Sequence, residues 1–87
     1  METETLQYTP KLMGTVKRYD ADMGWGLISP HDGGNALHVD KALLRENGIL
    51  TLEKGRLVLF DVEREFNMER SEEWVSVKNL KVLSYSH

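Results

Sequence analysis

The sequence predicts an all-β domain built as a five-stranded antiparallel β-barrel. Five short β-compatible runs are separated by turn residues, and no segment keeps a helical period beyond a single turn. The chain has 87 residues, of which 40% are hydrophobic and 29% are charged, as expected for one globular domain with a small core. A chain of this length favours a closed or nearly closed barrel over a two-layer sandwich.

The first three expected strands lie in the first half of the chain. Residues 12–19 form the first strand, in which the alternation of a strand turns Val16 inward. Residues 25–29 and 35–39 form the second and third strands, and each is preceded by a turn rich in Asp and Gly. Three antiparallel strands therefore follow one another along the chain.

The second half is expected to hold one helical turn and two longer strands. Residues 41–47 are too short for a stable helix, and they form a single turn that packs Leu44 inward before Gly48. The last strand covers residues 74–83. The fourth strand covers residues 56–64; its core face holds Val58, Phe60 and Val62, and its outer face holds Leu57 and Leu59.

The two ends of the chain are expected to lie outside the domain. Residues 1–10 are polar, end in a proline and lack any period, which predicts a flexible N-terminal arm. The alternative is that Tyr8 folds back as a stacking residue or as part of an extra strand. The domain then covers residues 11–83, and residues 84–87 form a C-terminal tail.

Composition restricts the cellular setting. There is no cysteine, so neither disulfides nor thiolate metal sites hold the fold. No apolar run reaches the length of a membrane span, and the N-terminus lacks the order of a secretory signal. The expected location is the cytoplasm, without membrane attachment.

Catalytic and metal-binding patterns are not found. His38 and Asp40 share one strand face, but two ligands are fewer than a zinc site needs. No nucleophile motif and no phosphate-binding glycine loop is present. The sequence thus predicts a protein that is not an enzyme and that uses no cofactor, metal or small-molecule substrate.

The most specific motif is the stretch of residues 14–41, GTVKRYDADMGWGLISPHDGGNALHVDK. Glycines on both sides of Trp25 indicate a sharp bend or a close approach of backbone, and they are expected to leave room beside the indole for a flat ligand. The order and spacing resemble those of a cold-shock domain, whose pattern runs Gly-x-Val-Lys, Lys-Gly-aromatic-Gly-Phe-Ile and Val-Phe-Val-His-Phe. The matching positions are Gly14, Val16, Lys17, Arg18, Tyr19, Met23, Gly24, Trp25, Gly26, Leu27, Ile28, Leu37, His38, Val39, Asp40 and Lys41.

The resemblance covers positions 12–83 and implies a Greek-key barrel of the oligonucleotide/oligosaccharide-binding (OB) type that binds single-stranded RNA or DNA. It implies that Trp25 stacks on bases, with Tyr19 and His38 as supports. It also implies that Lys17, Arg18 and Lys41 contact phosphate. Leu27 occupies the position of a stacking phenylalanine, and it completes the expected nucleic-acid-binding set.

Several positions depart from the family pattern. Aromatics of the pattern are replaced by Arg18, Leu27, His38, Lys41 and Ile49, and a lysine is replaced by Met23. If each base stack contributes about 1–3 kcal/mol, losing four or so aromatics removes on the order of 4–12 kcal/mol of generic strand binding. The guanidinium of Arg18 and the imidazole of His38 offset part of that loss, because both planes stack on bases.

A second hypothesis is a diverged barrel that acts as a protein-interaction module, for example as a homodimer, with little nucleic-acid binding. The net charge of −3 is unusual for a nucleic-acid binder. The outward Leu57 and Leu59 are expected to form an apolar interface patch with Ile49, Leu50 or residues 82–83, unless the chain's own ends cover them. Binding of a single strand, weak or selective, remains the first hypothesis.

Overall fold

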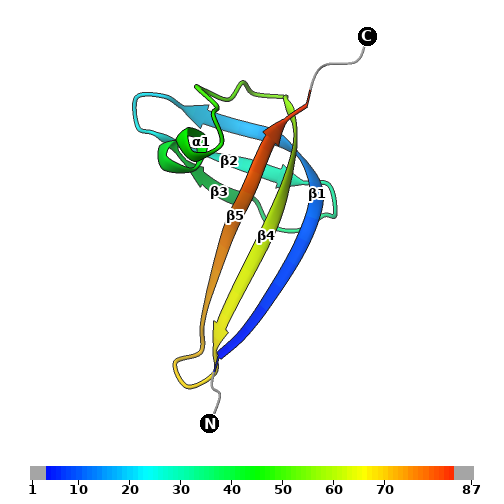
Figure 1. The fold of residues 1–87 in the computed structure, drawn as a ribbon, viewed down its shortest axis with the longest axis vertical. Helices are drawn as coiled ribbons and strands as arrows, with labels where there is room; N and C mark the ends of the chain where they lie inside the picture. The colour runs from blue at the N-terminus through cyan, green and yellow to red at the C-terminus, as the bar shows by residue number, and fades with distance from the viewer. Residues whose placement is uncertain (1–3, 84–87) are drawn as a thin grey trace.

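The structure is a computed structural model that describes residues 4–83. Its elements are β1 (Glu4–Asp20), β2 (Trp25–Pro30), β3 (Leu37–Asp40), α1 (Lys41–Glu46), β4 (Leu57–Asn67) and β5 (Glu72–Val82). The strands form one antiparallel sheet in the order β3-β2-β1-β4-β5. The sheet curls so that its outer strands, β3 and β5, approach each other beside α1, which contacts both (Figure 1). The fold is therefore the predicted all-β, nearly closed five-stranded barrel.

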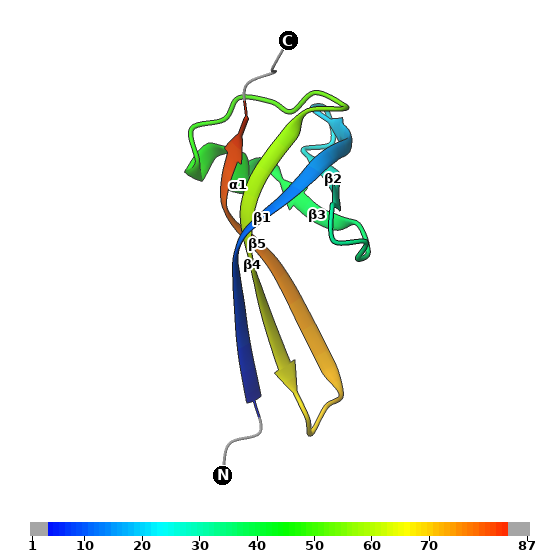
Figure 2. The ribbon, with the colours of Figure 1, turned by 90° about the vertical axis from the view of Figure 1, so that its right-hand side faces the viewer.

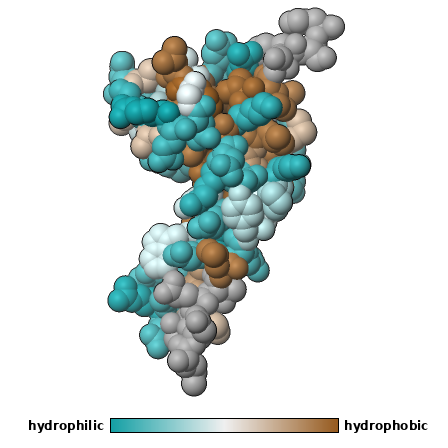
Figure 3. Space-filling model, in the orientation of Figure 1, coloured by the Kyte–Doolittle hydropathy of each residue, from teal (hydrophilic) through white to brown (hydrophobic). Residues whose placement is uncertain are grey.

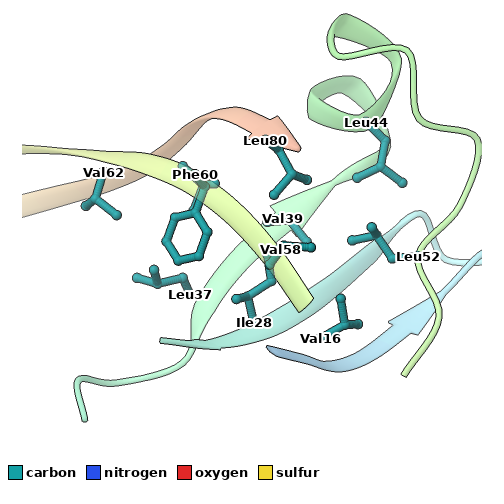
Figure 4. Packing of buried hydrophobic residues seen from close by; sticks show 11 residues of the cluster. Val16, Ile28, Leu37, Val39, Leu44, Leu52, Val58, Phe60, Val62 and Leu80 are labelled. Carbon is teal, nitrogen blue, oxygen red and sulfur yellow. The ribbon is translucent and has the colours of Figure 1, made fainter. Parts of the chain in front are cut away.

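The barrel interior is a single apolar cluster with Phe60 fully buried within it (Figure 4). The alternation predicted for the fourth strand is confirmed, because Val58, Phe60 and Val62 are buried while their neighbours are partly exposed. Leu44 is the buried residue of α1, as the sequence indicates. The other members of the cluster are Val16, Ile28, Leu37, Val39, Leu52, Val77 and Leu80.

The sheet does not end with the barrel. Residues 4–9 of β1, 62–67 of β4 and 72–77 of β5 continue past it as a three-stranded antiparallel sheet, here called the projecting sheet (Figures 1 and 2). The described residues consequently form an elongated shape of 51 × 28 × 20 Å. The start of β1 at Glu4 and the turn between β4 and β5 lie at the far end of this projection (Figure 1).

The N-terminal segment differs from the expected flexible arm. From Glu4 onward it belongs to β1 and pairs with β4, with Glu4 opposite Asn67 and Thr9 opposite Val62. The cause is a long-range one: β4 runs on well beyond the barrel and offers a free ladder of backbone groups that residues 4–9 complete. The expected tail, residues 84–87, lies outside the described residues.

Two strand irregularities mark the waist between barrel and projecting sheet. The β1–β4 register shifts between Thr9 and Leu12, and Lys11 there has a φ of 54°. The β4–β5 register shifts between Leu59 and Asp61, where Asn79 has a φ of 53°. Bulges of this kind insert unpaired residues and increase local twist. The crossing of the strands at this level is visible in Figure 2.

Asp61 binds both bulges at the waist. One carboxylate oxygen accepts from the Lys11 backbone N–H at 2.9 Å, and the other accepts from Asn79 Nδ2 at 2.7 Å and from the Tyr8 hydroxyl. Hydrogen bonds from Tyr8, Asn79 and the Lys11 backbone hold the pKa of Asp61 below its usual value. The hydrogen bond to Asp61 is also the main cause of the raised pKa of Tyr8.

Candidate nucleic-acid interface

The outer face of β1, β2 and β3 gathers most of the residues singled out in the sequence. Trp25 and Leu27 are two positions apart on β2 and therefore point to the same side. Leu27 lies opposite Arg18 on β1 and opposite His38 on β3. The three strands thus bring a basic, an apolar and an imidazole side chain into one row across the sheet.

Trp25 has two ring contacts on this face. Its ring and that of His38 are stacked, with centroids 5.6 Å apart and planes inclined by 18°. The guanidinium carbon of Arg18 lies 5.2 Å from the Trp25 ring centroid, within the range of a cation–π contact. The Trp25 ring thus has a stacked imidazole and a guanidinium as its neighbours.

A β-bulge in β1 explains how Arg18 reaches Trp25. The register with β2 shifts between Val16 and Arg18, which makes Lys17 the extra residue. Without the bulge Arg18 would share the inward face of Val16, which is buried. The bulge turns Arg18 to the outer face and leaves Lys17 exposed beside it.

Tyr19 is not part of this surface, although the resemblance implies that it supports stacking. The bulge turns it to the inner side, where it is partly buried and packs against the core. A Cβ atom on Gly26 would lie 2.8 Å from Tyr19 Cδ1 and 2.4 Å from the carbonyl oxygen of Arg18. Gly26 is therefore required by the close approach of β1. The space on the inner side of Gly26 is filled by Tyr19, whereas room for a ligand beside the Trp25 indole, on the outer face, stays a prediction.

Gly24 has a different role from Gly26. It has a φ of 78°, in the left-handed region, and its N–H donates to the carbonyl of Asp20 at 2.8 Å. It closes the turn that precedes β2. Its own carbonyl accepts from the Lys41 N–H at 2.9 Å, and the aliphatic part of Lys41 lies close to it. This contact places the exposed Lys41 at the end of the strand that carries Trp25.

The carboxylates nearest to Trp25 act as caps. Asp20 and Asp40 lie opposite Trp25 on the neighbouring strands. Asp20 Oδ1 accepts from the N–H groups of Asp22 and Met23 at 2.9 and 3.0 Å. Asp40 is the N-cap of α1, and its Oδ1 accepts from the Leu43 N–H at 2.9 Å. Both carboxylates stabilise local backbone, and both keep a negative charge beside the candidate interface.

His31 is a residue of this face that sequence reasoning left in a turn. Its ring Nε2 lies 2.8 Å from the Thr15 hydroxyl, and its backbone N–H donates to Met13. Its imidazole is therefore fixed against the outer face of β1. A histidine in a Gly-rich turn gives no sequence signal for this placement, because the contact depends on how the turn folds back. Among residues 4–83 no group of three side chains suited to a metal ion occurs.

The leucine patch is smaller than expected. Leu57 and Leu59 are half-buried and lie opposite Thr15 and Met13. The expected partners Ile49 and Val82 pack against the core instead of extending the patch. The patch of Leu57, Leu59 and Met13 is thus confined to one side of β1 and β4. Figure 3 shows that the largest apolar areas on this side of the molecule belong to the barrel.

Together, the nearly closed five-stranded barrel and its stacked outer face define an OB-type domain. The family model of the "Cold-shock" DNA-binding domain matches residues 12–77. The chain belongs to the cold-shock domain family. At the level of the family, this match supports nucleic-acid binding.

Curated relatives agree with this assignment. The chain is 39% identical to Cold shock-like protein CspB of Yersinia pestis over 54 residues, which are 62% of this chain and 77% of that protein. It is 44% identical to Cold shock domain-containing protein 4 of Arabidopsis thaliana over 50 residues, or 58% of this chain. That match spans only 25% of the plant protein, and a similar match spans 23% of Glycine-rich protein 2 of Nicotiana sylvestris.

The family match covers most of the barrel together with the β4 and β5 parts of the projecting sheet. It begins at Leu12 and therefore leaves out residues 4–9, the β1 part of that sheet. As for membranes, none of the helices within residues 4–83 has the length and apolar character needed to span one.

Proposed function

We propose that this protein binds single-stranded RNA or DNA on the outer face of β1, β2 and β3. It does so by base stacking and phosphate contact, as part of RNA chaperoning or gene regulation in the cytoplasm. The observation that carries the proposal is the stacked pair of Trp25 and His38, with Arg18 at the same ring. A stacked pair of rings with a cation beside it offers an outer ring face on which a base can stack, and base–aromatic stacking tolerates any sequence.

Each of the other residues has a defined role in this proposal. Leu27 supplies apolar contact between the flanking Arg18 and His38. Lys17 and Lys41 are exposed at the margin of the face, where their ammonium groups neutralise phosphates. The face carries the three cations Lys17, Arg18 and Lys41, but the carboxylates of Asp20 and Asp40 lie beside them. The electrostatic contribution to strand binding is therefore weak. Binding is therefore expected to depend chiefly on stacking.

Substitution of Trp25 tests the proposal. Loss of one stack, at about 1–3 kcal/mol, weakens binding by roughly 5- to 150-fold. The assay is fluorescence anisotropy of labelled single-stranded RNA and DNA oligonucleotides with the parent and Trp25→Ala, at two salt concentrations. Affinity of the parent is expected to fall as salt rises, because phosphate contacts release counterions.

Trp74 supplies the matched control. It lies on the projecting sheet, opposite Glu65 and 48% exposed, so Trp74→Ala removes an exposed indole without touching the barrel face. This control is expected to bind as the parent does. In the Trp25→Ala chain, the fluorescence of Trp74 reports whether the protein is folded. Equal affinity of the parent and a folded Trp25→Ala variant would contradict the stacking role, and equal losses in both variants would exclude the barrel face as the site.

A further inference from the structure

The projecting sheet exposes a strand edge that nothing in the described chain covers. Residues 4–9 of β1 pair with β4 on one side, while pairing of β1 with β2 begins only at Gly14. The backbone N–H and C=O groups on the other side of these residues consequently have no strand partner among residues 4–83. An unpaired strand edge is a template for another strand.

The other edge of the projecting sheet is partly shielded. Along β5, Ser76 and Val77 line shallow pockets together with Leu43 and Glu46 of α1. β5 also contacts β3 in the barrel. A strand approaching β5 would meet these elements. The β1 edge is thus the less obstructed of the two, since residues 75–77 of β5 adjoin α1.

The β1 edge lacks the features that usually prevent pairing. Natural edge strands carry charged residues, prolines, bulges or a covering loop. Residues 5–9, TLQYT, contain no charge and no proline, in a chain in which 29% of the residues are charged. The first proline and the first bulge come only at Pro10 and Lys11. Five consecutive residues are therefore open to pairing.

Apolar side chains flank this edge on one face. Leu6 and Tyr8 are two positions apart, and they are 61% and 49% exposed. The Tyr8 hydroxyl is held by Asp61 of β4 and Asn79 of β5, so the ring has a fixed position and extends from β1 across β4, while the aliphatic side chain of Leu6 makes no such contact within residues 4–83. A partner that adds to the edge would cover these side chains.

We propose that a second copy of this chain pairs antiparallel with the β1 edge, about a two-fold axis at Gln7. In this register Leu6 of each copy lies opposite Tyr8 of the other, and the backbone of Thr5 lies opposite that of Thr9. Gln7 lies opposite Gln7 of the partner subunit. Aromatic–aliphatic cross-strand pairs of this kind stabilise antiparallel sheets. The product is a continuous six-stranded sheet.

The edge fits a copy of itself better than an unrelated strand. A two-fold interface uses every contact twice, so the residues on both sides of its centre must be complementary to each other. Here Leu6 and Tyr8 are complementary about Gln7, and the only charged residue in the paired stretch, Glu4, lies opposite Pro10. No like charges are opposed. The absence of charge over residues 5–9, in a protein of net charge −3, removes the main repulsion between two copies.

The pairing is independent of the proposed nucleic-acid site. Trp25 and His38 belong to the barrel, whereas the edge belongs to the projecting sheet, and antiparallel pairing directs the two barrels away from each other. A dimer therefore leaves both barrel faces open. Failure of one proposal does not imply failure of the other.

Sedimentation velocity over a range of submillimolar concentrations tests the pairing. The parent is expected to change from its chain mass of 10.0 kDa to twice that mass as concentration rises. Gln7→Lys and Gln7→Glu each oppose two like charges at the axis, and each is expected to weaken the dimer on the order of fivefold. An equimolar mixture of the two variants places Lys opposite Glu, and it is expected to dimerise more strongly than either alone. The matched control is Leu50→Lys, at a side chain that is 99% exposed on a loop of the barrel.

A disulfide crosslink provides a second test of the proposed β1–β1 register. Because the chain has no cysteine, Gln7→Cys introduces a single thiol that lies opposite its own copy, at a Cα separation compatible with a disulfide. Mild oxidation is expected to yield a covalent dimer for Gln7→Cys and much less for Leu50→Cys. If the parent stays monomeric over the whole concentration range, the proposal is overturned, and the partner of the β1 edge would have to be a different protein. Equal dimerisation of the two separate Gln7 charge variants and of their mixture also overturns it, because the axis would then lie elsewhere.

Discussion

Gly26→Ala tests the link between barrel packing and the nucleic-acid face. Gly26 is buried, and an added Cβ would lie 2.4 Å from the carbonyl oxygen of Arg18 and 2.8 Å from Tyr19 Cα. Both neighbours are backbone atoms of β1, so they cannot be relieved by a rotamer change. The Ala variant therefore forces β1 and β2 apart at the bulge that turns Arg18 outward.

The magnitude follows from two opposed effects. Overpacking of a close contact lowers the free energy of unfolding by about 1–3 kcal/mol. Replacing Gly by Ala also restricts the unfolded chain, which raises the free energy of unfolding by about 0.4–1 kcal/mol. The expected net loss is on the order of 1–2 kcal/mol of unfolding free energy. For a domain of this size that loss corresponds to a melting temperature lower by roughly 4–16 °C.

Thermal and urea denaturation followed by tryptophan fluorescence measure this loss. The matched control is Gly34→Ala, because a Cβ there would approach only side-chain atoms, with Asp32 Oδ1 nearest at 3.1 Å. Gly34→Ala is expected to be nearly neutral. A folded Gly26→Ala chain should also bind oligonucleotides more weakly, since the Arg18 backbone is displaced. If Gly26→Ala melted at the same temperature as Gly34→Ala, the close approach of β1 to β2 would not be the reason for this glycine.

Two further predictions concern carboxylates. Asp61→Asn is expected to lower stability at neutral pH. Because the folded-state pKa of Asp61 lies below its unfolded value near 3.8, the parent's advantage is present above that value and is lost as the pH falls through the folded pKa. Urea titrations of both chains from pH 7 to pH 2 measure this, and a difference that does not change with pH would contradict it. Asp40→Ala is expected to cost about 0.5–2 kcal/mol through loss of the cap on Leu43, whereas Asp40→Asn keeps a capping side chain and loses little. Both variants remove a negative charge opposite Trp25, so oligonucleotide anisotropy should show tighter binding in each; unchanged affinity would place the phosphates away from Asp40.

The barrel was predictable because its signals are local. Alternation in residues 56–64 identified Val58, Phe60 and Val62 as core residues, and a short run before Gly48 identified the turn that buries Leu44. Each of these inferences uses spacing within one element, and the spacing fixes which side chains share a face.

The projecting sheet was not predictable from the same kind of signal. Residues 4–9 alternate only weakly, and their pairing partner lies more than fifty positions away in β4. The bend at the waist depends on Lys11 and Asn79 in left-handed conformations and on Asp61 binding both, which are contacts between three strands. Such a bend leaves no periodic pattern in the sequence.

The candidate site was predictable in composition but not in geometry. The family pattern located Trp25, His38 and Arg18, but the bulge at Lys17 decides which of the β1 residues faces out. Counting residues without the bulge places Tyr19 beside Trp25 and Arg18 in the core, which reverses their positions in the structure. The single extra residue of the bulge therefore places the cation Arg18 on the outer face and the aromatic Tyr19 on the inner side.

This exchange changes how the missing aromatics should be weighed. Counted one by one, the replaced positions remove on the order of 4–12 kcal/mol of stacking. His38, however, takes a phenylalanine position and stacks on Trp25 with planes only 18° apart, so a planar ring is kept at that position. Arg18 takes another aromatic position and adds a cation at the ring, and guanidinium planes also stack on bases. Two of the substitutions thus preserve a planar group, Arg18 also adds a charge that attracts phosphate, and the loss that remains falls on Leu27, Lys41 and Ile49. Affinity for a single strand should accordingly depend more on salt than it would on an all-aromatic face, because a larger share of the contact is electrostatic.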